Sequence, residues 1–486
     1  MIQVLFTPGT KIIAIDPDRV VFERQGRRMA LRGTNDLASV FRTLAPGQAD
    51  LRDIRASAGA AEVTGAAGAA DATDQVSRAL NMLAARQLVR FRCFAEGREL
   101  LGAEALGPLG TFDLTHTTND DTGQRPLQLS RFAYAHRDEQ GLVIDCPHRS
   151  TRLTAGEAGI GGYLVTLAAP ITRAELVRHL PALPPELAGE CIALLLAAGA
   201  AAEADDDGLL PEDRHPALAQ REFHDVLMHS RSRYGMGGGP TGATFSFAGI
   251  IPPLPALKPP SLKPTADDHL LPLPRPDLTR LASCDPPLVT TMETRQSRRR
   301  HGDRPLSLDE LGEFLYRVGR VRDIKPANPA DPHSYETTRR TYPSGGAVYD
   351  LEIYLVAHQC AGVAPGMYHY EPADHALSLI QQDERILQGL LRYARMSSGF
   401  AGVPQALFVI SSRFTRLSWK YHGIAYATTL RNVGVLYEAM YLAATAMGLA
   451  PCALGGGNSQ LFAEATALDP LTESSVGEFM LGTVAG

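Results

Sequence analysis

A run of prolines in the middle of the chain limits most strongly how it can fold. Residues 251–290 hold 11 of the 34 prolines, where an even spread would place about three. Proline lacks the N–H that a sheet ladder needs, and it breaks helix interiors, so we expect neither helix nor sheet there. The stretch predicts an extended connector between separately folded parts.

The length supports this division, because 486 residues exceed the size at which one hydrophobic core stops growing. We divide the chain into two N-terminal units, 1–112 and 113–215, a Pro/Gly-rich connector, 216–290, and a C-terminal domain, 291–486. Helical and strand patterns occur on both sides of the proline run, and HDVLMHSRSR at 224–233 predicts a short helix ahead of it, so the predicted fold class is α+β.

The two N-terminal units repeat one pattern, which is typical of a winged helix. Short alternating strands precede a helix with apolar residues at i, i+3, i+4 and i+7, and a second helix and a strand follow. The first helix of unit one carries Leu37, Val40, Phe41 and Leu44 behind Asn35 as N-cap, and that of unit two carries Ile160, Tyr163, Leu164 and Leu167. The Ala/Gly-rich insert at 56–73 is expected to be a mobile loop.

Charge argues against DNA as the partner of these units. Residues 1–110 hold 14 basic and 12 acidic side chains, and residues 111–215 hold 8 and 16. A DNA reader needs unopposed basic residues on its recognition helix, and the helix around Leu187–Leu196 has none. A winged helix can instead bind a peptide as an added strand, so the units are predicted to be peptide clamps.

The C-terminal domain alternates helices with strands. The predicted elements are helices at 308–318 and 384–394, strands at 351–357 and 406–411, and a hairpin through 368–379. A further helix at 428–447 is apolar nearly all round, so we expect it to be buried on every side, as the spine of a dimer interface.

Three motifs in this domain point to a bound anion and a flat ligand. Arg295, Ser297, Arg298 and Arg299 could hold a phosphate through guanidinium groups and a hydroxyl. Pro343, Ser344, Gly345 and Gly346 form a turn that lets backbone approach a ring system. Gly455 and Gly456 offer N–H groups to an anion. Each motif alone is weak, and no G-x-G-x-x-G or Walker motif is present.

In this order and spacing the motifs resemble the nitroreductase-like flavoproteins. SRRRHGDRPLSLDELGEFLYRVGRV, RRTYPSGGAVYDLEIYLVAH and APGMYHYEPADHALSLI resemble the SagB-type azoline dehydrogenases of thiazole- and oxazole-containing peptides, and among these the cyanobactin oxidases. The resemblance covers residues 216–486 well and 1–215 in architecture only. It implies a C-terminal nitroreductase-like FMN domain with a mixed sheet flanked by helices, which acts as a homodimer behind two peptide-clamp units.

The resemblance also implies the site. Lys420 and Tyr421 match the adjacent Lys-Tyr pair that is catalytic in that branch, and His422 adjoins them. The FMN-binding set would be Arg295, Ser297, Arg298 and Arg299 at the phosphate, Pro343, Ser344, Gly345 and Gly346 at the ring, and Gly455 and Gly456 at the phosphate or ribityl chain. Gln296 departs from the second arginine usual in nitroreductases.

The implied reaction explains the Lys-Tyr pair. Oxidising a thiazoline or oxazoline to the azole removes a proton from one ring carbon and a hydride, which goes to the flavin, from its neighbour. A lysine can take the proton near neutral pH only where burial or a positive neighbour lowers its pKa. Lys420 would be this base, and Tyr421 would orient it or relay the proton.

The expected partners are an azoline-containing precursor peptide, a second copy of the chain and the cyclodehydratase of the same pathway, with no nucleic acid and no membrane. Without a signal-peptide pattern or C-x-x-C pairs, we expect a cytoplasmic protein with free thiols and no metal. Two alternatives stay open: an NAD(P)H-dependent nitro or quinone reductase, and a winged-helix regulator that senses flavin.

Overall fold

The computed structural model divides into two compact units, residues 1–239 and 240–486, and each is described by itself. The structure describes residues 2–485 except 17, 25, 33–37, 60–65, 115–124, 180–182, 234–235, 238–240, 246–259, 265–269, 332 and 400, together with the backbone alone at 59 and 66–74. Asn35, the predicted N-cap, and residues 251–259 and 265–269 of the proline run therefore lie outside the described residues.

A seven-stranded sheet is the centre of the first unit. Its order is β5-β1-β6-β7-β11-β10-β9, with β1 (Ile2–Phe6), β5 (Gln48–Asp50), β6 (Val89–Ala95), β7 (Arg98–Ala105), β9 (Tyr134–Asp138), β10 (Gly141–Cys146) and β11 (Thr151–Ala155). The pairing of β7 with β11 joins strands from both predicted N-terminal units. One continuous apolar core lies against this sheet.

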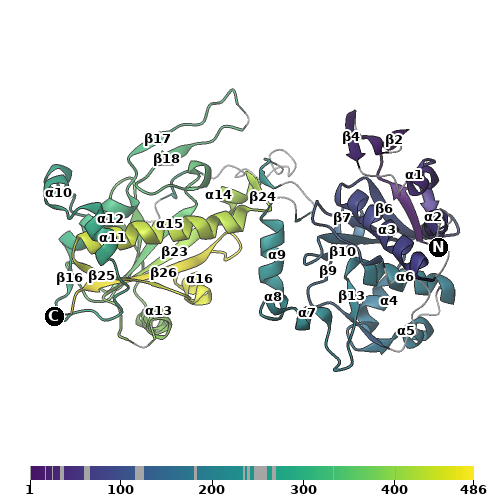
Figure 1. Cartoon of the computed structure of the whole chain (residues 1–486). Helices are drawn as coiled ribbons and strands as arrows, with labels where there is room; N and C mark the ends of the chain where they lie inside the picture. Colours follow the sequence, from purple (N-terminus) through teal and green to yellow (C-terminus); the bar gives the residue numbers. More distant parts are fainter. Residues whose placement is uncertain are drawn as a thin grey trace. The chain divides into compact units, whose positions relative to one another are not determined.

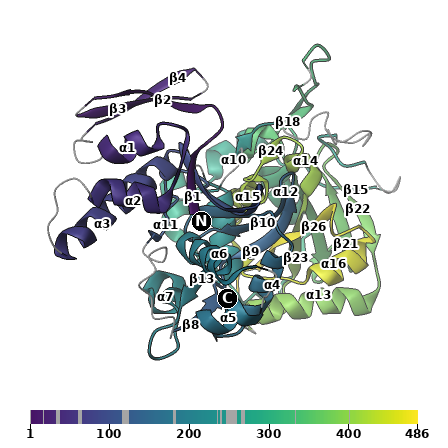
Figure 2. The same cartoon turned by 90° about the vertical axis from the view of Figure 1, so that its right-hand side faces the viewer.

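Two smaller sheets complete the first unit. One is the meander β2 (Thr10–Ile15), β3 (Arg19–Arg24) and β4 (Arg27–Arg32), and the other holds β8 (Pro126–Leu129), β12 (Ile171–Thr172) and β13 (Ala201–Glu203). Figure 2 shows the meander beside α1 (Ala38–Leu44), where Phe22 contacts Phe41 with ring centroids 5.9 Å apart. The winged-helix assignment of each half stays a prediction.

The remaining helices of this unit are α2 (Leu51–Gly59), α3 (Ala66–Ala85), α4 (Gly159–Thr166), α5 (Arg173–His179), α6 (Pro185–Ala198), α7 (Pro211–Arg214), α8 (Pro216–Ala219) and α9 (Phe223–Arg231). The expected loop at 56–73 is wrong in its described part, because α2 runs to Gly59 and α3 starts at Ala66. Alanine has the highest helix propensity, which outweighs the glycines there.

The second unit is built on another seven-stranded sheet, of order β15-β22-β21-β19-β23-β26-β25. Its strands are β15 (Leu270–Pro272), β19 (Leu351–Ala357), β21 (Gly366–Glu371), β22 (Ala376–Gln381), β23 (Ala406–Arg413), β25 (Leu449–Leu454) and β26 (Glu473–Thr483). Every pairing described in it is antiparallel, so the expected mixed sheet is wrong within one chain. A tight connection, such as that between β21 and β22, reverses the direction of the chain, so the two strands it joins are antiparallel.

Helices cover both faces of this sheet (Figure 1). The core on one face includes residues of α12 (Leu308–Gly319) and α15 (Ala425–Ala446), and the core on the other includes α13 (Glu384–Ser397) and α16 (Ser459–Thr466). The strand, hairpin and helix predictions for 308–411 are confirmed. The short pieces are α14 (Phe414–Ser418), β14 (Gly242–Ala243), β16 (Leu306–Ser307), β17 (Asp323–Lys325), β18 (Thr337–Arg339), β20 (Cys360–Ala361), β24 (Tyr421–His422) and a 3-10 turn at Gly345–Ala347.

The helix predicted to be buried on every side, α15, is buried on one side only within this chain. Leu436 and Met440 are fully buried in the core. Tyr426, Leu430 and Val435 are instead 52%, 39% and 37% exposed. The exposed side of α15 therefore carries these three apolar side chains beside the exposed Arg431 and Glu438, and the described residues of its own chain leave it uncovered.

The connector prediction is wrong for its second half, where α10 (Leu278–Cys284) and α11 (Leu288–Thr294) form. Asp277 caps α10 through its carboxylate, and Pro287 is the N-cap residue of α11. The first turn of a helix tolerates proline because its N–H would have no partner there. Pro272 ends β15 at the sheet edge, where a missing N–H is also tolerated.

Candidate active site

Lys420 and Tyr421 lie against the glycine turn that the sequence assigned to the flavin ring. Gly346 has a φ of +62°, and a Cβ built on it would fall 2.7 Å from Lys420 Nζ and still closer to Tyr421 Oη. A side chain at this position would therefore collide with both predicted catalytic groups. The structure thus brings together three residues that are separated by about seventy-five positions in the chain.

The Lys420 ammonium is surrounded by aromatic rings. Its Nζ lies 4.6 Å from the ring centroid of Tyr335, 5.0 Å from that of Tyr421 and 5.8 Å from that of Phe245. Lys420 is only 9% exposed, and its Nζ donates a hydrogen bond to Tyr335 Oη at 2.5 Å. Rings attract a cation through their negative faces, so the cluster holds the charged end of Lys420 in place.

A short strand pairing and a buried arginine position this lysine. β24 pairs with β14, and Phe245 N donates to the Lys420 carbonyl at 3.1 Å. Arg416, on α14, is fully buried, and its Nε and Nη2 donate to the carbonyls of Val348 and Glu336. Burial lowers the Arg416 pKa to about 10, which leaves the guanidinium charged at neutral pH.

A hydrogen bond from α15 fixes the glycine turn. Gly345 N donates to Asn432 Oδ1 at 3.0 Å, and Asn432 Nδ2 donates to Asp350 Oδ1 at 2.7 Å. Asp350 is fully buried and also accepts from hydroxyls of β23 and α15. Ser344 Oγ accepts from Tyr349 N, while Pro343 and Gly346 stay exposed. The exposed face of the turn is therefore open to a ligand.

The predicted phosphate cluster meets α15 at its other end. Ser297 Oγ lies 2.8 Å from Tyr441 Oη, which also accepts from Ala453 N. The Arg295 guanidinium lies 5.2 Å from the Tyr441 ring centroid. Arg298 N donates to Pro451 O, and Arg299 is exposed. Burial raises the pKa of the Cys452 thiol, and the Arg299 charge only partly opposes this rise. The phosphate cluster therefore lies beside β25, the strand that leads to the glycines at 455–457.

Gly455 and Gly456 lie at the exposed end of β25, and a Cβ on either would contact nothing within 4 Å. At the next glycine, Gly457, the side chain of Glu478 occupies the space where a Cβ would lie. Glu478 is 7% exposed, and burial raises its pKa to about 7. An acid that is partly neutral at physiological pH thus lies under the glycine run.

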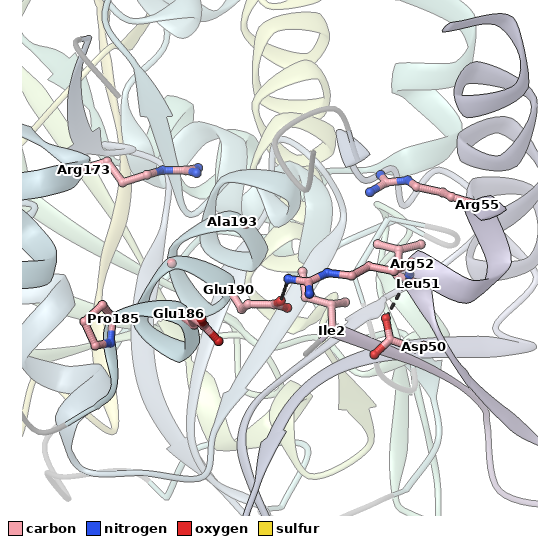
Figure 3. A pocket seen from close by; sticks show the side chains of 11 residues that line it. Ile2, Asp50, Leu51, Arg52, Arg55, Arg173, Pro185, Glu186, Glu190 and Ala193 are labelled. Atoms are coloured by element: carbon pink, nitrogen blue, oxygen red, sulfur yellow. Dashed lines mark hydrogen bonds and ion pairs between the residues drawn. The ribbon is translucent and has the colours of Figure 1, made fainter. Parts of the chain in front are cut away.

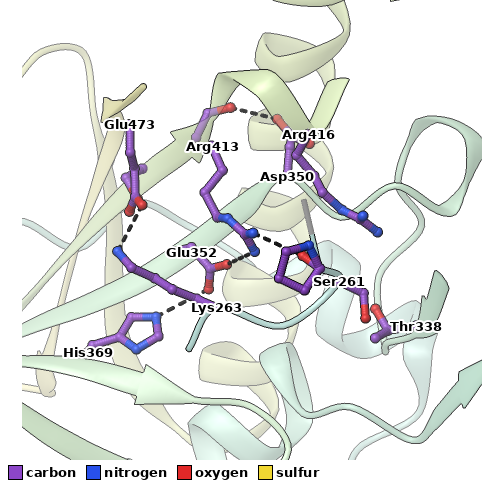
Figure 4. A network of polar contacts seen from close by, with 12 residues as sticks. Ser261, Lys263, Thr338, Asp350, Glu352, His369, Arg413, Arg416 and Glu473 are labelled. Carbon is purple, nitrogen blue, oxygen red and sulfur yellow. Dashed lines mark hydrogen bonds and ion pairs between the residues drawn. The ribbon is translucent and has the colours of Figure 1, made fainter. Parts of the chain in front are cut away.

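A buried polar network lies beside the site (Figure 4). Glu352 accepts from Arg413 and contacts His369, and Lys263 bridges Glu473 and the hydroxyl of Tyr354. Burial opposes charge on His369, but two buried glutamates outweigh it and raise its pKa to about 9. Through Lys263 this network fixes the described end of the connector to the sheet.

A cavity of about 320 Å³ lies in the first unit (Figure 3), where the two predicted halves meet. Its charged lining is balanced, with three arginines and three acids: Arg52, Arg55, Arg173, Asp50, Glu186 and Glu190. Arg52 Nη2 pairs with Glu190 Oε1 at 2.8 Å. This ion pair connects α2 of the first half to α6 of the second.

Sequence reasoning missed Tyr335, Phe245 and Tyr441, because nothing in a lone aromatic residue signals a polar contact far along the chain. Asn432 did leave a signal, since a buried amide in an apolar helix needs partners. His422 lies in β24 beside the pair, with no contact to Lys420 Nζ among the described hydrogen bonds.

No group of His, Cys, Asp or Glu side chains suited to a metal occurs among the described residues, and all six cysteines are free. Among the helices that the structure describes, none is both long and apolar enough to cross a membrane.

Two family models match the chain. Residues 127–237 match "Cyanobactin oxidase ThcOx", and residues 292–483 match "Nitroreductase family". The nitroreductase-type protein MJ1384 of Methanocaldococcus jannaschii is 29% identical over 161 residues, which are 33% of this chain and 74% of that protein. The microcin B17-processing protein McbC of Escherichia coli is 30% identical over 149 residues, 29% of this chain. The match spans about half of McbC, 52%.

The E. coli microcin synthetase McbBCD complex with truncated pro-MccB17 is 24% identical with a TM-score of 0.32, and the match covers 40% of this chain and 73% of that one. A nitroreductase-type protein of Desulfovibrio desulfuricans in complex with FMN is 16% identical with a TM-score of 0.27, covering 42% and 88%. The resemblance stated from the sequence motifs is confirmed by the family matches: the chain carries a cyanobactin oxidase segment followed by a nitroreductase-family domain, and it is a distant homologue of McbC.

Proposed function

We propose that this protein is an FMN-dependent azoline oxidase, which converts thiazolines or oxazolines in a ribosomally made peptide to thiazoles or oxazoles, with O2 reoxidising the flavin. One observation carries the proposal: the Lys420–Tyr421 pair lies directly against the Gly346 turn. A base is needed beside a flavin only when the substrate must lose a proton as well as a hydride.

The residues have separate roles in this reaction. Lys420 Nζ takes the proton from the ring carbon that was the α-carbon of the modified residue. Tyr421, whose hydroxyl lies on the same side of Gly346, orients the lysine or relays the proton to it. FMN, when bound, supplies the acceptor for the hydride from the neighbouring ring carbon.

The residues fit FMN better than a dinucleotide. The exposed Arg299 and the half-buried Arg298, with Ser297, suit one phosphate group, and open space over Gly455 and Gly456 lets a ligand approach the backbone. Arg295, Ser297, Arg298 and Arg299 would hold the phosphate, Pro343, Ser344, Gly345 and Gly346 the ring, and Gly455 and Gly456 the phosphate or ribityl chain.

Replacing Arg299 with alanine is expected to weaken FMN binding by about tenfold to a hundredfold, because a charge-assisted contact to the phosphate is lost. FMN released on denaturation, measured by fluorescence against protein concentration, checks this. Arg300→Ala is the matched control, since Arg300 is an exposed neighbour outside the proposed set. Equal FMN content in both variants would remove Arg299 from the site.

We also propose that two chains form the active unit through α15. The helix contacts the glycine turn near Asn432 and the phosphate cluster at Tyr441, roughly 14 Å apart at 1.5 Å per residue. On its exposed face, Tyr426 and Leu430 lie before these two contacts and Val435 lies between them, and the described residues of the chain leave all three uncovered. A second copy would cover this face and could complete each flavin site with residues from both chains.

Leu430→Arg is expected to convert dimers to monomers, because the substitution places a charge on the uncovered face without touching the core. Met440, which the core buries, would not distinguish an interface from a folding defect. Sedimentation or light scattering measures the change. Met396→Arg is the control, since Met396 is 46% exposed on α13, across the sheet from α15. Dimers that persist in Leu430→Arg would contradict the interface.

The peptide substrate would bind the first unit at β4. Strand β11 is paired on both sides, by β10 and β7, so it has no free edge for an added strand. Strand β4 pairs only with β3 among the described strands, and it carries Arg27, Arg28 and Arg32 with no acid. A free edge favours an extended peptide as an added strand, and Arg27 and Arg32 favour an acidic one, so we propose a peptide-clamp surface at β4.

Anaerobic mixing with an azoline-containing peptide tests the function. The yellow flavin should bleach, and mass spectrometry should show the loss of two hydrogens from the peptide; oxygen should then restore the colour. Bleaching by NAD(P)H with no response to the azoline would favour the reductase alternative. The cyclodehydratase that makes the azoline is a proposed partner.

A further inference from the structure

Tyr335 lies between the proposed base and the glycine turn. Its Oη accepts a hydrogen bond from Lys420 Nζ at 2.5 Å and donates one to the carbonyl oxygen of Gly346 at 2.5 Å. Nothing in the sequence motifs assigned a role to this residue, which belongs to the segment between β17 and β18.

The direction of these bonds is fixed by the number of protons. A tyrosine hydroxyl has one proton, and a peptide carbonyl can only accept. The proton of Tyr335 is therefore used at Gly346, and the hydroxyl can act only as an acceptor toward Lys420. One N–H of Lys420 must then point at Tyr335, whether the lysine is charged or neutral.

The position of Tyr335 is set by its neighbours. Arg416 donates to the carbonyls of Glu336, next to Tyr335, and Val348, two residues after Gly346. The same buried guanidinium thus holds the segment that carries Tyr335 close to the turn that carries Gly346. The Tyr335 ring packs edge-on against Trp419, with centroids 5.4 Å apart. The connector adds a further contact, since Ser261 N donates to Glu336 Oε1 at 2.9 Å.

We propose that Tyr335 is a positioning residue for Lys420: by accepting one N–H, it turns the lone pair of the neutral amine away from itself, so that this lone pair faces the substrate carbon. This inference rests on the proposed function. In the step it serves, the ring C–H bond breaks, the proton joins the Lys420 lone pair, and the bonding electrons enter the azole as the neighbouring carbon gives up its hydride, for which FMN, when bound, would be the acceptor.

Tyr335→Phe tests the proposal, because it removes the hydroxyl and keeps the ring. Azoline oxidation should fall about tenfold to a hundredfold in kcat with little change in KM. Acetylation of Lys420 at pH 7 by a trace of acetic anhydride, followed by mass spectrometry without substrate, should become faster, because the ammonium loses an acceptor that stabilises it. A merely structural defect would not move the two rates in opposite directions.

Tyr368→Phe is the matched control, since the Tyr368 hydroxyl also contacts a carbonyl, that of Ala364, in the same unit; both of its rates should equal wild type. If Tyr335→Phe folds poorly, 3-fluorotyrosine at 335 should give a smaller change in the same directions. Unchanged acetylation and unchanged kcat would overturn the proposal. Faster acetylation in a protein whose wild type does not oxidise azolines would leave the hydrogen bond in place and reject the proposed function instead.

Discussion

Lys420→Ala is expected to retain FMN and the dimer but to lose azoline oxidation by about 10²- to 10⁴-fold, the range for removal of a general base. The lysine contacts Tyr335 and aromatic rings rather than the phosphate cluster, so binding of the cofactor should persist. Single-turnover reduction of the flavin by an azoline peptide, followed at its visible absorbance band, measures the loss.

Two comparisons make this result specific. After chemical reduction the variant should be reoxidised by O2 at the wild-type rate, because that half-reaction needs no substrate base. Tyr421→Phe should lose less activity if Tyr421 orients the lysine, and as much if it relays the proton. Azole formation at a near-normal rate in Lys420→Ala would reject the mechanism, whereas an NAD(P)H-dependent reductase would keep its hydride transfer.

Glu478→Gln is expected to change how stability depends on pH. Burial raises the folded-state pKa of Glu478 to about 7 from an ordinary value of 4.5, so the folded protein holds this proton more tightly than the unfolded chain. Wild-type stability should therefore fall as pH rises from about 4.5 through about 7 and then level off. Between pH 5 and pH 8 the pKa difference corresponds to a loss of about 2 to 3 kcal/mol.

The glutamine variant lacks this titration, so its free energy of unfolding relative to wild type should rise by that amount from pH 5 to pH 8. Urea unfolding of flavin-free protein at the two pH values measures it. Glu438→Gln, at an exposed position of α15, should show no such difference. A Glu478→Gln curve parallel to wild type across this range would mean that the carboxyl is solvated in the folded protein.

The sequence predicted the second unit well where local signals agree. The capping box of Ser307 and Glu310 starts α12, and the run 351–357, apolar except for Glu352, became the central strand β19. The predictions failed where contacts with distant parts of the chain decide the local structure. Proline was taken to exclude helix throughout 251–290, but Pro287 stands at a helix start. The apolar pattern of α15 in the sequence does not reveal which side of the helix is covered by the rest of its own chain.

The same limit applies to the site. Lys420 and Tyr421 could be found because they are adjacent and accompany recognisable motifs. Tyr335 could not, because its role depends on Arg416 holding two distant backbone segments together. Such a residue is defined by a contact between segments rather than by a pattern along the chain.

The pairing of β7 with β11 has a consequence for dissection of the first unit. A fragment that ends near residue 112 would lack β11, so one edge of β7 would be unpaired. The remaining chain would lack β7, so one edge of β11 would be unpaired. Two bare, complementary edges favour reassociation, assisted by the Arg52–Glu190 ion pair. The two halves, produced as separate polypeptides, should therefore behave as a split protein that reassembles, rather than as two independent domains.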